Sequence, residues 1–378
     1  MRDIVIIGGG YAGVLAAIRA ARLLPRGEFR VRLIDRGDAL VERIRLHEVA
    51  AGRPLRAHKY EKLLRGTGVE HVRGEVESLS LDGSSVVLTG GERVHFDRAV
   101  YAIGSEGGRN DGSGRAGIPP SFSIGSVGGA LAAADALRRL RDGASLAIVG
   151  GGLTGIESAA EIADAYPSLR VTLIDAGEIG DSLSPRGKAH LRASLSSRGV
   201  TLREHTLVAS PSDVDADAVL WCASFAVSRI AADAGLAVDR AGRVIVDDHL
   251  RSSDPRILAI GDAALVTIGG TNLSMACATA LPMGAYAGEE LAGVARAPFD
   301  FAYAITCISL GRRDGIVQMR APDNTARDTI ISGRAGAFVK EIICRYTIMS
   351  LRLERAGVPY RWPGGLLRRE AKLEARHA

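Results

Sequence analysis

Two glycine-rich segments of this chain have residue types and spacings suited to binding a dinucleotide. In the first, residues 3–35, Gly8, Gly10 and Gly13 follow an apolar strand-like stretch, and a helix-like stretch and a second strand lead to Asp35. Glycines at these positions allow a tight turn, a close approach of the backbone to a pyrophosphate and tight packing of a helix on a strand. A carboxylate at the end of the second strand can accept hydrogen bonds from ribose hydroxyls. The segment therefore predicts a dinucleotide site; the alternative is a glycine-rich turn in another α/β fold.

The same pattern recurs at residues 144–175, with its glycines and terminal acid at Gly150, Gly152, Gly155 and Asp175. Two complete copies predict two nucleotide sites. Because hydride passes readily between a nicotinamide and a flavin, the simplest pair of cofactors is NAD(H) and FAD. Asp175 is followed by Ala176 and no arginine, which favours NADH over NADPH because a carboxylate repels a 2′-phosphate. The alternative is that Asp175 only caps the next turn.

The composition is typical of a globular α/β protein. The chain has 378 residues, of which 47% are hydrophobic, 24% charged and 4% aromatic. Its length predicts two or three domains. The chain enters a strand-like stretch at its third residue, and it has no uncharged apolar run of about 20 residues. We therefore expect no secretory signal and no transmembrane helix, and a cytoplasmic, reducing location.

The four cysteines lack the spacing of a metal site or of a redox-active disulfide, since no C-x-x-C motif joins Cys222, Cys277, Cys307 and Cys344. We therefore expect no metal.

The net charge of +5 is concentrated near the C-terminus, because from Arg345 onward the chain has eight Lys or Arg against three Glu. This basic tail is either solvated or in peripheral contact with an anionic membrane surface. No nucleic-acid motif accompanies it, so nucleic acid is not an expected partner.

The rest of the chain alternates between strand-like, helical and irregular patterns. Residues 41–53 are helical in pattern, and residues 105–121, rich in Gly, Ser and Pro, are expected to form a linker. Strand-like stretches lie at residues 69–79, 85–89, 93–96, 98–105, 218–224 and 257–261. Asp262 follows the last of these strands, where an acid can bond the ribityl hydroxyls of a flavin or be an ordinary strand-end acid.

Four motifs give the chain a family resemblance: GGGYAG at residues 8–13, YAIG at 101–104, GGGLTGIE at 150–157 and AIGDAA at 259–264. With them the chain resembles the two-dinucleotide-binding flavoproteins of the glutathione-reductase-like group. Without the redox disulfide of that group, it looks like the type II NADH dehydrogenases (NADH:quinone oxidoreductases) and their relatives. The stretches at 307–319 and 336–355 look like the C-terminal portion of those enzymes.

The resemblance implies an α/β fold with two Rossmann-like dinucleotide-binding domains, the second inserted in the first, and a small C-terminal α+β region. The implied boundaries are 1–106 and 244–298 for the FAD-binding domain, 107–243 for the NAD(H)-binding domain and 299–378 for an interface or membrane-proximal region.

The resemblance also implies the cofactor-binding residues. For FAD they are Gly8, Gly10, Tyr11, Ala12, Gly13, Asp35, Arg36, Arg43, Val76, Ala102, Ile103, Gly104, Gly261, Asp262, Leu281 and Pro282. For NAD(H) they are Gly150, Gly152, Leu153, Thr154, Gly155, Asp175 and Ala223.

Glu157 is the candidate catalytic residue. Hydride transfer needs no protein acid or base, so few catalytic side chains are expected. Glu157 lies in the first turn of the second unit's helix, where the resemblance places a glutamate near the nicotinamide and the flavin. The alternative is a carboxylate favoured only by the helix dipole. Glu161, one turn further on, is expected to face solvent or a domain contact.

The electron acceptor stays open. Type II enzymes carry two glutamines near the quinone head, where this chain has Thr279 and Met283. The leading hypothesis is a quinone or quinone-like acceptor. A soluble reductase or oxidase acting on a specialised small molecule or a redox protein is second, and an NADH-binding sensor is third.

Several other side chains have two interpretations each. Cys277 lies on a helix expected near the flavin, yet a lone cysteine there is usually a small core residue. Arg43 and His47 either contact the flavin or second substrate, or belong to a salt-bridged surface helix. Arg312 and Arg313 are expected in a solvated turn.

An apolar stripe at helical spacing lies near the C-terminus, at Phe338, Ile342, Tyr346, Met349 and Leu353. Such a stripe is more typical of core or of a dimer interface than of a membrane face. We expect a homodimer.

Overall fold

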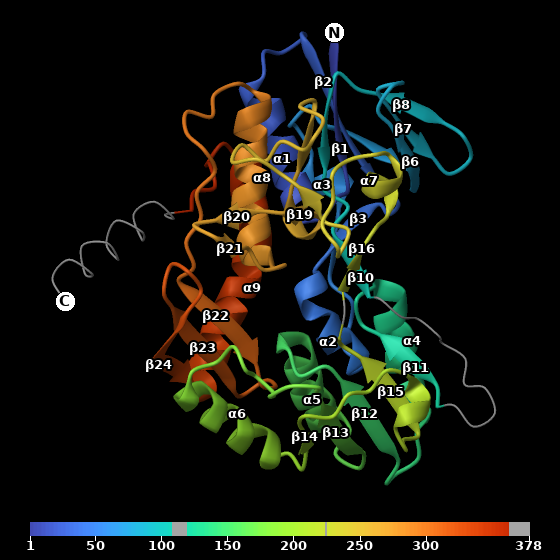
Figure 1. The fold of residues 1–378 in the computed structure, drawn as a ribbon, viewed down its shortest axis with the longest axis vertical. Helices are drawn as coiled ribbons and strands as arrows, with labels where there is room; N and C mark the ends of the chain where they lie inside the picture. The colour runs from blue at the N-terminus through green and yellow to red at the C-terminus, as the bar shows by residue number, and fades with distance from the viewer. Residues whose placement is uncertain (108–118, 224, 363–378) are drawn as a thin grey trace, which may run out of the picture.

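The structure is a computed structural model that describes residues 1–107, 119–223 and 225–362. It has two lobes, one above the other along its long axis, with the first glycine-rich unit in the upper lobe and the second in the lower lobe (Figure 1). The α/β architecture with two parallel sheets agrees with the fold class expected from the sequence.

The first sheet carries the first glycine-rich unit. Its five parallel strands, in spatial order, are β18 (Ile257–Ala259), β9 (Arg98–Tyr101), β1 (Arg2–Ile7), β2 (Phe29–Asp35) and β5 (Glu70–Arg73). The apolar run of β1 is buried on both faces, as expected of a central parallel strand. Helix α1 (Tyr11–Leu23) begins directly after the glycine turn and packs on α8 (Cys277–Leu291).

The second sheet repeats this arrangement. Its parallel strands are β11 (Ser121–Ser123), β15 (Ala218–Trp221), β12 (Ser145–Val149), β13 (Arg170–Ile174) and β14 (Thr201–Arg203). Helix α5 (Leu153–Ala165) follows the second glycine turn as α1 follows the first. Since β18 joins the first sheet, the chain returns there after completing the second.

The two crossings between the sheets pair with each other. Strands β10 (Ser105–Gly107) and β16 (Phe225–Val227) form an antiparallel ribbon. The sequence predicted an irregular linker at 105–121, so its first three residues differ from that prediction; residues 108–118 lie outside the described part. The other elements of the second lobe are α4 (Val127–Arg139), α6 (Pro185–Ser196) and η2 (Pro211–Asp213).

The remaining elements of the first lobe are short. The segment predicted as helical at 41–53 contains η1 (Arg43–Arg45) and α2 (Leu46–Ala50), and α2 packs on α4 and α5 of the second lobe. The others are β3 (Ala39–Val41), β4 (Ala57–Lys59), α3 (Tyr60–Leu63), β6 (Val76–Ser80), β7 (Ser85–Leu88), β8 (Arg93–His95), α7 (Ile230–Asp233), β17 (Val244–Ile245), η3 (Gly261–Ala263), β19 (Ala264–Leu265), β20 (Thr267–Ile268) and β21 (Thr271–Asn272).

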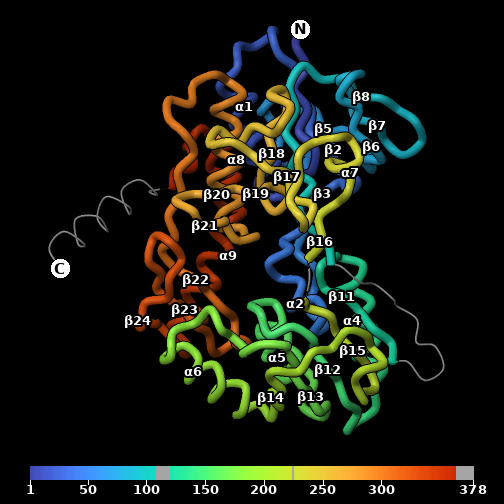
Figure 2. Tube along the Cα trace, viewed as in Figure 1, coloured from blue at the N-terminus to red at the C-terminus, as the bar shows by residue number. Residues whose placement is uncertain are grey.

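The C-terminal part joins the two lobes. An antiparallel sheet of β22 (Ile305–Ser309), β23 (Gly315–Arg320) and β24 (Ala326–Ser332) leads into α9 (Gly333–Arg355), which packs on this sheet and on α1. In Figure 2 this red and orange segment runs from beside α8 down to the green second unit. Among the described helices, none combines the length and apolar character that a bilayer crossing requires.

The apolar stripe of α9 is not core. Its side chains are exposed to different degrees: Phe338 68%, Ile342 49%, Tyr346 38%, Met349 49% and Leu353 38%. The core part of the prediction is therefore wrong, because the opposite face of α9 makes the packing contacts, with Cys344, Ile348 and Leu351 buried.

Candidate functional site

The first glycine turn forms a cradle that requires glycine at positions 8 and 13. Gly8 has φ +110°, and a Cβ added to Gly13 would lie 2.0 Å from the Gly8 carbonyl oxygen. A Cβ on Gly10, by contrast, would meet nothing within 4 Å, so this position opens outward. Asp35 accepts hydrogen bonds from the backbone N–H of Gly9 (2.7 Å) and of Gly37 (2.8 Å), which fixes its carboxylate beside the turn. This geometry fits the pyrophosphate and ribose of a dinucleotide.

The second glycine turn repeats the first almost atom for atom. Gly150 has φ +113°, and a Cβ on Gly155 would lie 1.8 Å from the Gly150 carbonyl oxygen. Asp175 accepts from the N–H of Gly151 (2.5 Å) and of Gly177 (2.7 Å). A cavity of about 490 Å³ lies beside Gly150 and Asp175 and extends to Ala223. Its place matches the adenosine end of a nucleotide bound at this turn.

The other residues assigned to FAD come from several segments of the chain. Asp262 accepts a hydrogen bond from the Ser105 hydroxyl (2.7 Å), and Arg43 donates to the Gly125 carbonyl (2.8 Å). Burial lowers the pKa of Arg43. Arg36 is exposed and pairs with Glu106 at 2.9 Å. Tyr11, Ala12, Ala102, Leu281 and Pro282 are buried, while Val76, Ile103, Gly104 and Gly261 are half-buried.

At the second turn, Leu153 is exposed and Thr154 half-buried, both at the start of α5. These cofactor assignments stay predictions.

Two residues that the sequence placed near the acceptor are already engaged. The Thr279 hydroxyl lies 2.8 Å from the carbonyl oxygens of Ser274 and Ala276. The Met283 sulfur lies 3.2 Å from the backbone nitrogen of Gly261. Both side chains are buried, so neither offers a free group to a ligand.

Glu157 is the centre of a buried polar cluster. One carboxylate oxygen accepts from the Lys340 ammonium (2.9 Å) and from the backbone N–H of Ser309 (2.9 Å). The other lies 3.5 Å from Nδ1 of His47. Lys340 also donates to the Cys307 carbonyl at 3.2 Å. The cluster therefore joins α5 and α2, which pack together in the second lobe, to both β22 and α9 of the C-terminal part.

Burial alone would raise the pKa of Glu157, but Lys340, His47 and the Ser309 N–H hold it below its ordinary value. Burial would lower the pKa of Lys340, but Glu157 raises it above its ordinary value. The two groups are thus both charged near neutral pH. Burial lowers the pKa of His47, against the opposing influence of Glu157, so its imidazole is neutral there.

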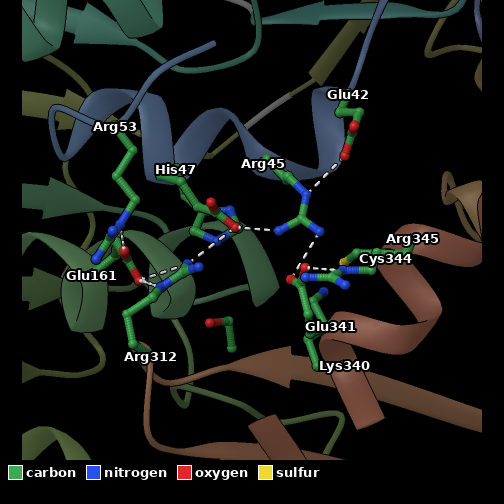
Figure 3. A network of polar contacts seen from close by, with 12 residues as sticks. Glu42, Arg45, His47, Arg53, Glu161, Arg312, Lys340, Glu341, Cys344 and Arg345 are labelled. Carbon is green, nitrogen blue, oxygen red and sulfur yellow. Dashed lines mark hydrogen bonds and ion pairs between the residues drawn. The ribbon is translucent and has the colours of Figure 1, made fainter. Parts of the chain in front are cut away.

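A chain of ion pairs runs beside this cluster (Figure 3). Arg312 contacts Glu48 (3.0 Å) and Glu161 (3.1 Å), and Glu161 also pairs with Arg53 (2.5 Å). Arg45 bridges Glu42, Glu48 and Glu341 at 2.8, 2.8 and 2.9 Å. Arg312 and Arg313 are exposed, as expected of a solvated turn, but the Arg312 guanidinium also pairs with the buried carboxylates of Glu48 and Glu161. Glu161 makes a domain contact, one of the two environments expected for it, and the segment of Arg43 and His47 is not a surface helix.

The thiols near Lys340 are protonated. Burial raises the pKa of Cys307 to about 12 and that of Cys344 to about 11, and it also raises that of Cys277. All four cysteines of the chain are free. In the described residues, no group of three or more His, Cys, Asp or Glu is arranged as metal ligands are. Thiolate chemistry at neutral pH is therefore not favoured here.

Sequence reasoning missed Lys340 and Ser309. Lys340 did carry a signal: it is a charged residue off the apolar stripe of its helix, next to Val339 and two positions before the apolar pair Ile342 and Ile343. Ser309 contributes only its backbone N–H, which no residue pattern reveals.

Two dinucleotide cradles on separate parallel sheets, with a buried acid–base pair between the lobes, define a two-cofactor oxidoreductase. A sequence model of the pyridine nucleotide-disulphide oxidoreductase family matches residues 2–284, and the chain belongs to this family.

The chain is 33% identical to an NADH dehydrogenase-like protein of Mycobacterium tuberculosis over 76% of its own length and 79% of the relative. It is 26% identical to the type II NADH:quinone oxidoreductase of Haemophilus influenzae, over 71% of this chain and 75% of the relative. The structure of the sulfide:quinone oxidoreductase from Aquifex aeolicus matches with a TM-score of 0.75 at 16% identity, covering 94% of this chain and 92% of that one, and shows the fold alone.

The protein is thus an NAD(P)H-dependent flavoprotein oxidoreductase with FAD and NAD(H) as cofactors, as the sequence predicted.

We expect Lys340→Met to destabilise the protein by about 3–5 kcal/mol at pH 8, because it leaves the buried Glu157 carboxylate unpaired. In the wild type the lowered pKa of Glu157 gives stability that is present above about pH 4.5 and lost as the pH falls through the folded-state value. In the variant, burial raises this pKa, so stability is regained as the pH falls. Thermal unfolding at pH 8 and pH 5 measures the difference.

The control is the same change in a Glu157→Gln background, where the penalty and its pH dependence are both expected to be small. An equal penalty in the two backgrounds would show that Lys340 stabilises the protein through its packing and not through Glu157.

Proposed function

We propose that the protein oxidises NADH and passes the electrons to a quinone or quinone-like acceptor. The observation that supports this best is the buried pair of Glu157 and Lys340, which lies where the two lobes and the C-terminal part meet. A charged lysine held without competing water can donate a hydrogen bond to a carbonyl oxygen on which negative charge develops. Quinone reduction develops such charge.

The residues divide the work between them. Bound FAD supplies the transfer of a hydride equivalent from NADH to the acceptor. The Gly150–Gly155 turn binds the nicotinamide nucleotide through backbone N–H groups, and the Gly8–Gly13 turn binds FAD in the same way. Lys340 offers a proton at Nζ, and Glu157 keeps that nitrogen protonated and in place.

A second candidate is a reductase for a specialised small molecule or a redox protein. The engaged side chains of Thr279 and Met283 favour it, because the polar pair expected at a quinone head is missing. An NADH-binding sensor is a third candidate, and rapid multiple turnover with any acceptor would exclude it.

The test is anaerobic turnover of the purified yellow protein with NADH and a short-chain soluble benzoquinone. We expect Glu157→Gln to retain FAD but to lower the rate of quinone reduction about tenfold or more, which corresponds to about 1.4 kcal/mol of lost transition-state stabilisation. Glu77→Gln is the control, since Glu77 is exposed on β6. A colourless protein that cannot be reconstituted with FAD, or a wild type inert toward quinones, would overturn the proposal.

We also propose that NADH is preferred over NADPH, because the Asp175 carboxylate lies at the nucleotide cavity. Replacing Asp175 by Ser and Ala176 by Arg is expected to reverse the preference, since the change removes a repelling charge and adds an attracting one. Rates of NADH and NADPH oxidation at matched concentrations measure it. A wild type that uses NADPH better would contradict the proposal.

We propose further that a second copy of the chain covers the apolar stripe of α9 in a homodimer, and that the basic tail contacts an anionic membrane peripherally. Residues 363–378 of that tail lie outside the described part of the chain. The double variant Phe338→Ser, Ile342→Ser is expected to sediment as a monomer, because both substitutions lie in the apolar stripe. It keeps the basic tail, so it is still expected to bind anionic vesicles at low salt. Attraction of about 1 kcal/mol per basic residue is screened at high salt. Vesicle binding that resists salt, or an unchanged dimer, would contradict these assignments.

A further inference from the structure

His47 has one nitrogen facing the Glu157 cluster and one nitrogen without a hydrogen-bond partner in the described structure. Only 4% of the residue is exposed. Its Nδ1 lies 3.5 Å from a Glu157 carboxylate oxygen, while Nε2 is buried and unpartnered among the described residues. Figure 3 shows His47 on the same side of its helix as Arg45, toward the C-terminal segments.

The chemistry of its neighbour fixes the role of each nitrogen. Glu157 is ionised and can only accept, so a neutral His47 facing it must carry its proton on Nδ1. Nε2 then bears a lone pair and is an acceptor. The charged groups around the imidazole are Glu48 on its own helix, Glu157 and Glu161 on α5, and Lys340 on α9.

A buried acceptor without a donor is costly. Leaving such a group unpaired costs about 1–3 kcal/mol, and native structures retain few of them. By contrast, one Glu157 oxygen accepts from both the Lys340 ammonium and the Ser309 N–H. Nε2 of His47 is thus the position at which a donor from a bound molecule would complete the cluster.

We propose that Nε2 of His47 accepts a hydrogen bond from the hydroxyl group that forms on the electron acceptor when it is reduced. This inference rests on the proposed function and names the class of acceptor. That class consists of molecules that gain O–H groups on two-electron reduction, such as quinones.

The overall change balances as NADH, one proton and quinone giving NAD⁺ and hydroquinone. NADH supplies two electrons and one proton as a hydride equivalent, and solvent supplies the second proton. An oxidised quinone has no donor for Nε2, whereas the hydroquinone has two. The contact therefore strengthens as reduction proceeds, which is the condition for an interaction to accelerate a reaction.

Two substitutions separate the two nitrogens of His47. His47→Asn keeps a nitrogen near the place of Nδ1, facing Glu157, and removes the group at Nε2. His47→Gln places an amide near Nε2 and removes the contact to Glu157. FAD content and melting temperature are measured first for both variants.

The main readout is equilibrium binding under anaerobic conditions of a short-chain benzoquinone and of its hydroquinone to the oxidised holoenzyme. We expect His47→Asn to weaken hydroquinone binding about tenfold, to leave quinone binding within about twofold, and His47→Gln to recover most of the loss.

The wild-type protein offers the same test without any substitution. The dimethyl ether of the hydroquinone lacks both donors and is expected to bind about tenfold more weakly than the hydroquinone.

The possible failures are distinguishable. A wild type that binds and reduces no quinone overturns the proposed function and this inference with it. If the wild type is active with quinone, two results overturn this inference alone. One is that His47→Asn binds hydroquinone normally. The other is that the affinities of His47→Asn for quinone and hydroquinone fall together, as they would where Nε2 binds only water. Weakened hydroquinone binding in His47→Gln but not in His47→Asn also overturns it, since His47 would then act through Glu157 alone.

Discussion

The ion pair between Glu157 and Lys340 is the constraint on which the arrangement of the two lobes depends. Each charge is removed from bulk water, and neither tolerates burial without the other. Lys340 comes from the last helix of the described chain and Glu157 from the second glycine-rich unit, with the Ser309 N–H as a further ligand of the carboxylate. Any change in the seating of the C-terminal part on the second lobe would therefore leave a buried charge uncompensated.

The chain of ion pairs beside this cluster favours one geometry of the junction but adds little to the stability of the fold. Buried ion pairs contribute little net stability, because desolvation offsets most of the Coulomb attraction. Arg312 and Arg45 nevertheless each bind carboxylates from more than one segment. Their ion pairs can therefore form together only in one relative arrangement of η1, α2, α5 and the C-terminal part. The hydride and electron path between two cofactors needs such fixed geometry, since a displacement of about 1 Å costs rate steeply.

The parts of the fold that the sequence predicted are those controlled by local pattern. Each βαβ unit has its apolar strand, its glycines and its terminal acid within about thirty-five residues, and the resulting turns depend on contacts inside that span. The junction could not be predicted in this way. Ser309 and Glu157 are 152 residues apart and meet through a backbone N–H. The ion pairs of Arg312 could not be predicted because its carboxylate partners belong to α2 and α5, and His47 stayed ambiguous for the same reason.

Helix α9 shows why the apolar stripe was misassigned to the core. Apolar residues occur on both sides of this helix: Ile348 and Leu351 are buried in the hydrophobic core of the first lobe, whereas Phe338 and Met349 are exposed. A hydrophobic period identifies apolar faces but cannot say which of two faces points inward. Lys340 decides the matter physically. Its ammonium needs the Glu157 carboxylate, and that requirement turns the lysine side of α9 toward the interior and leaves the regular stripe on the surface.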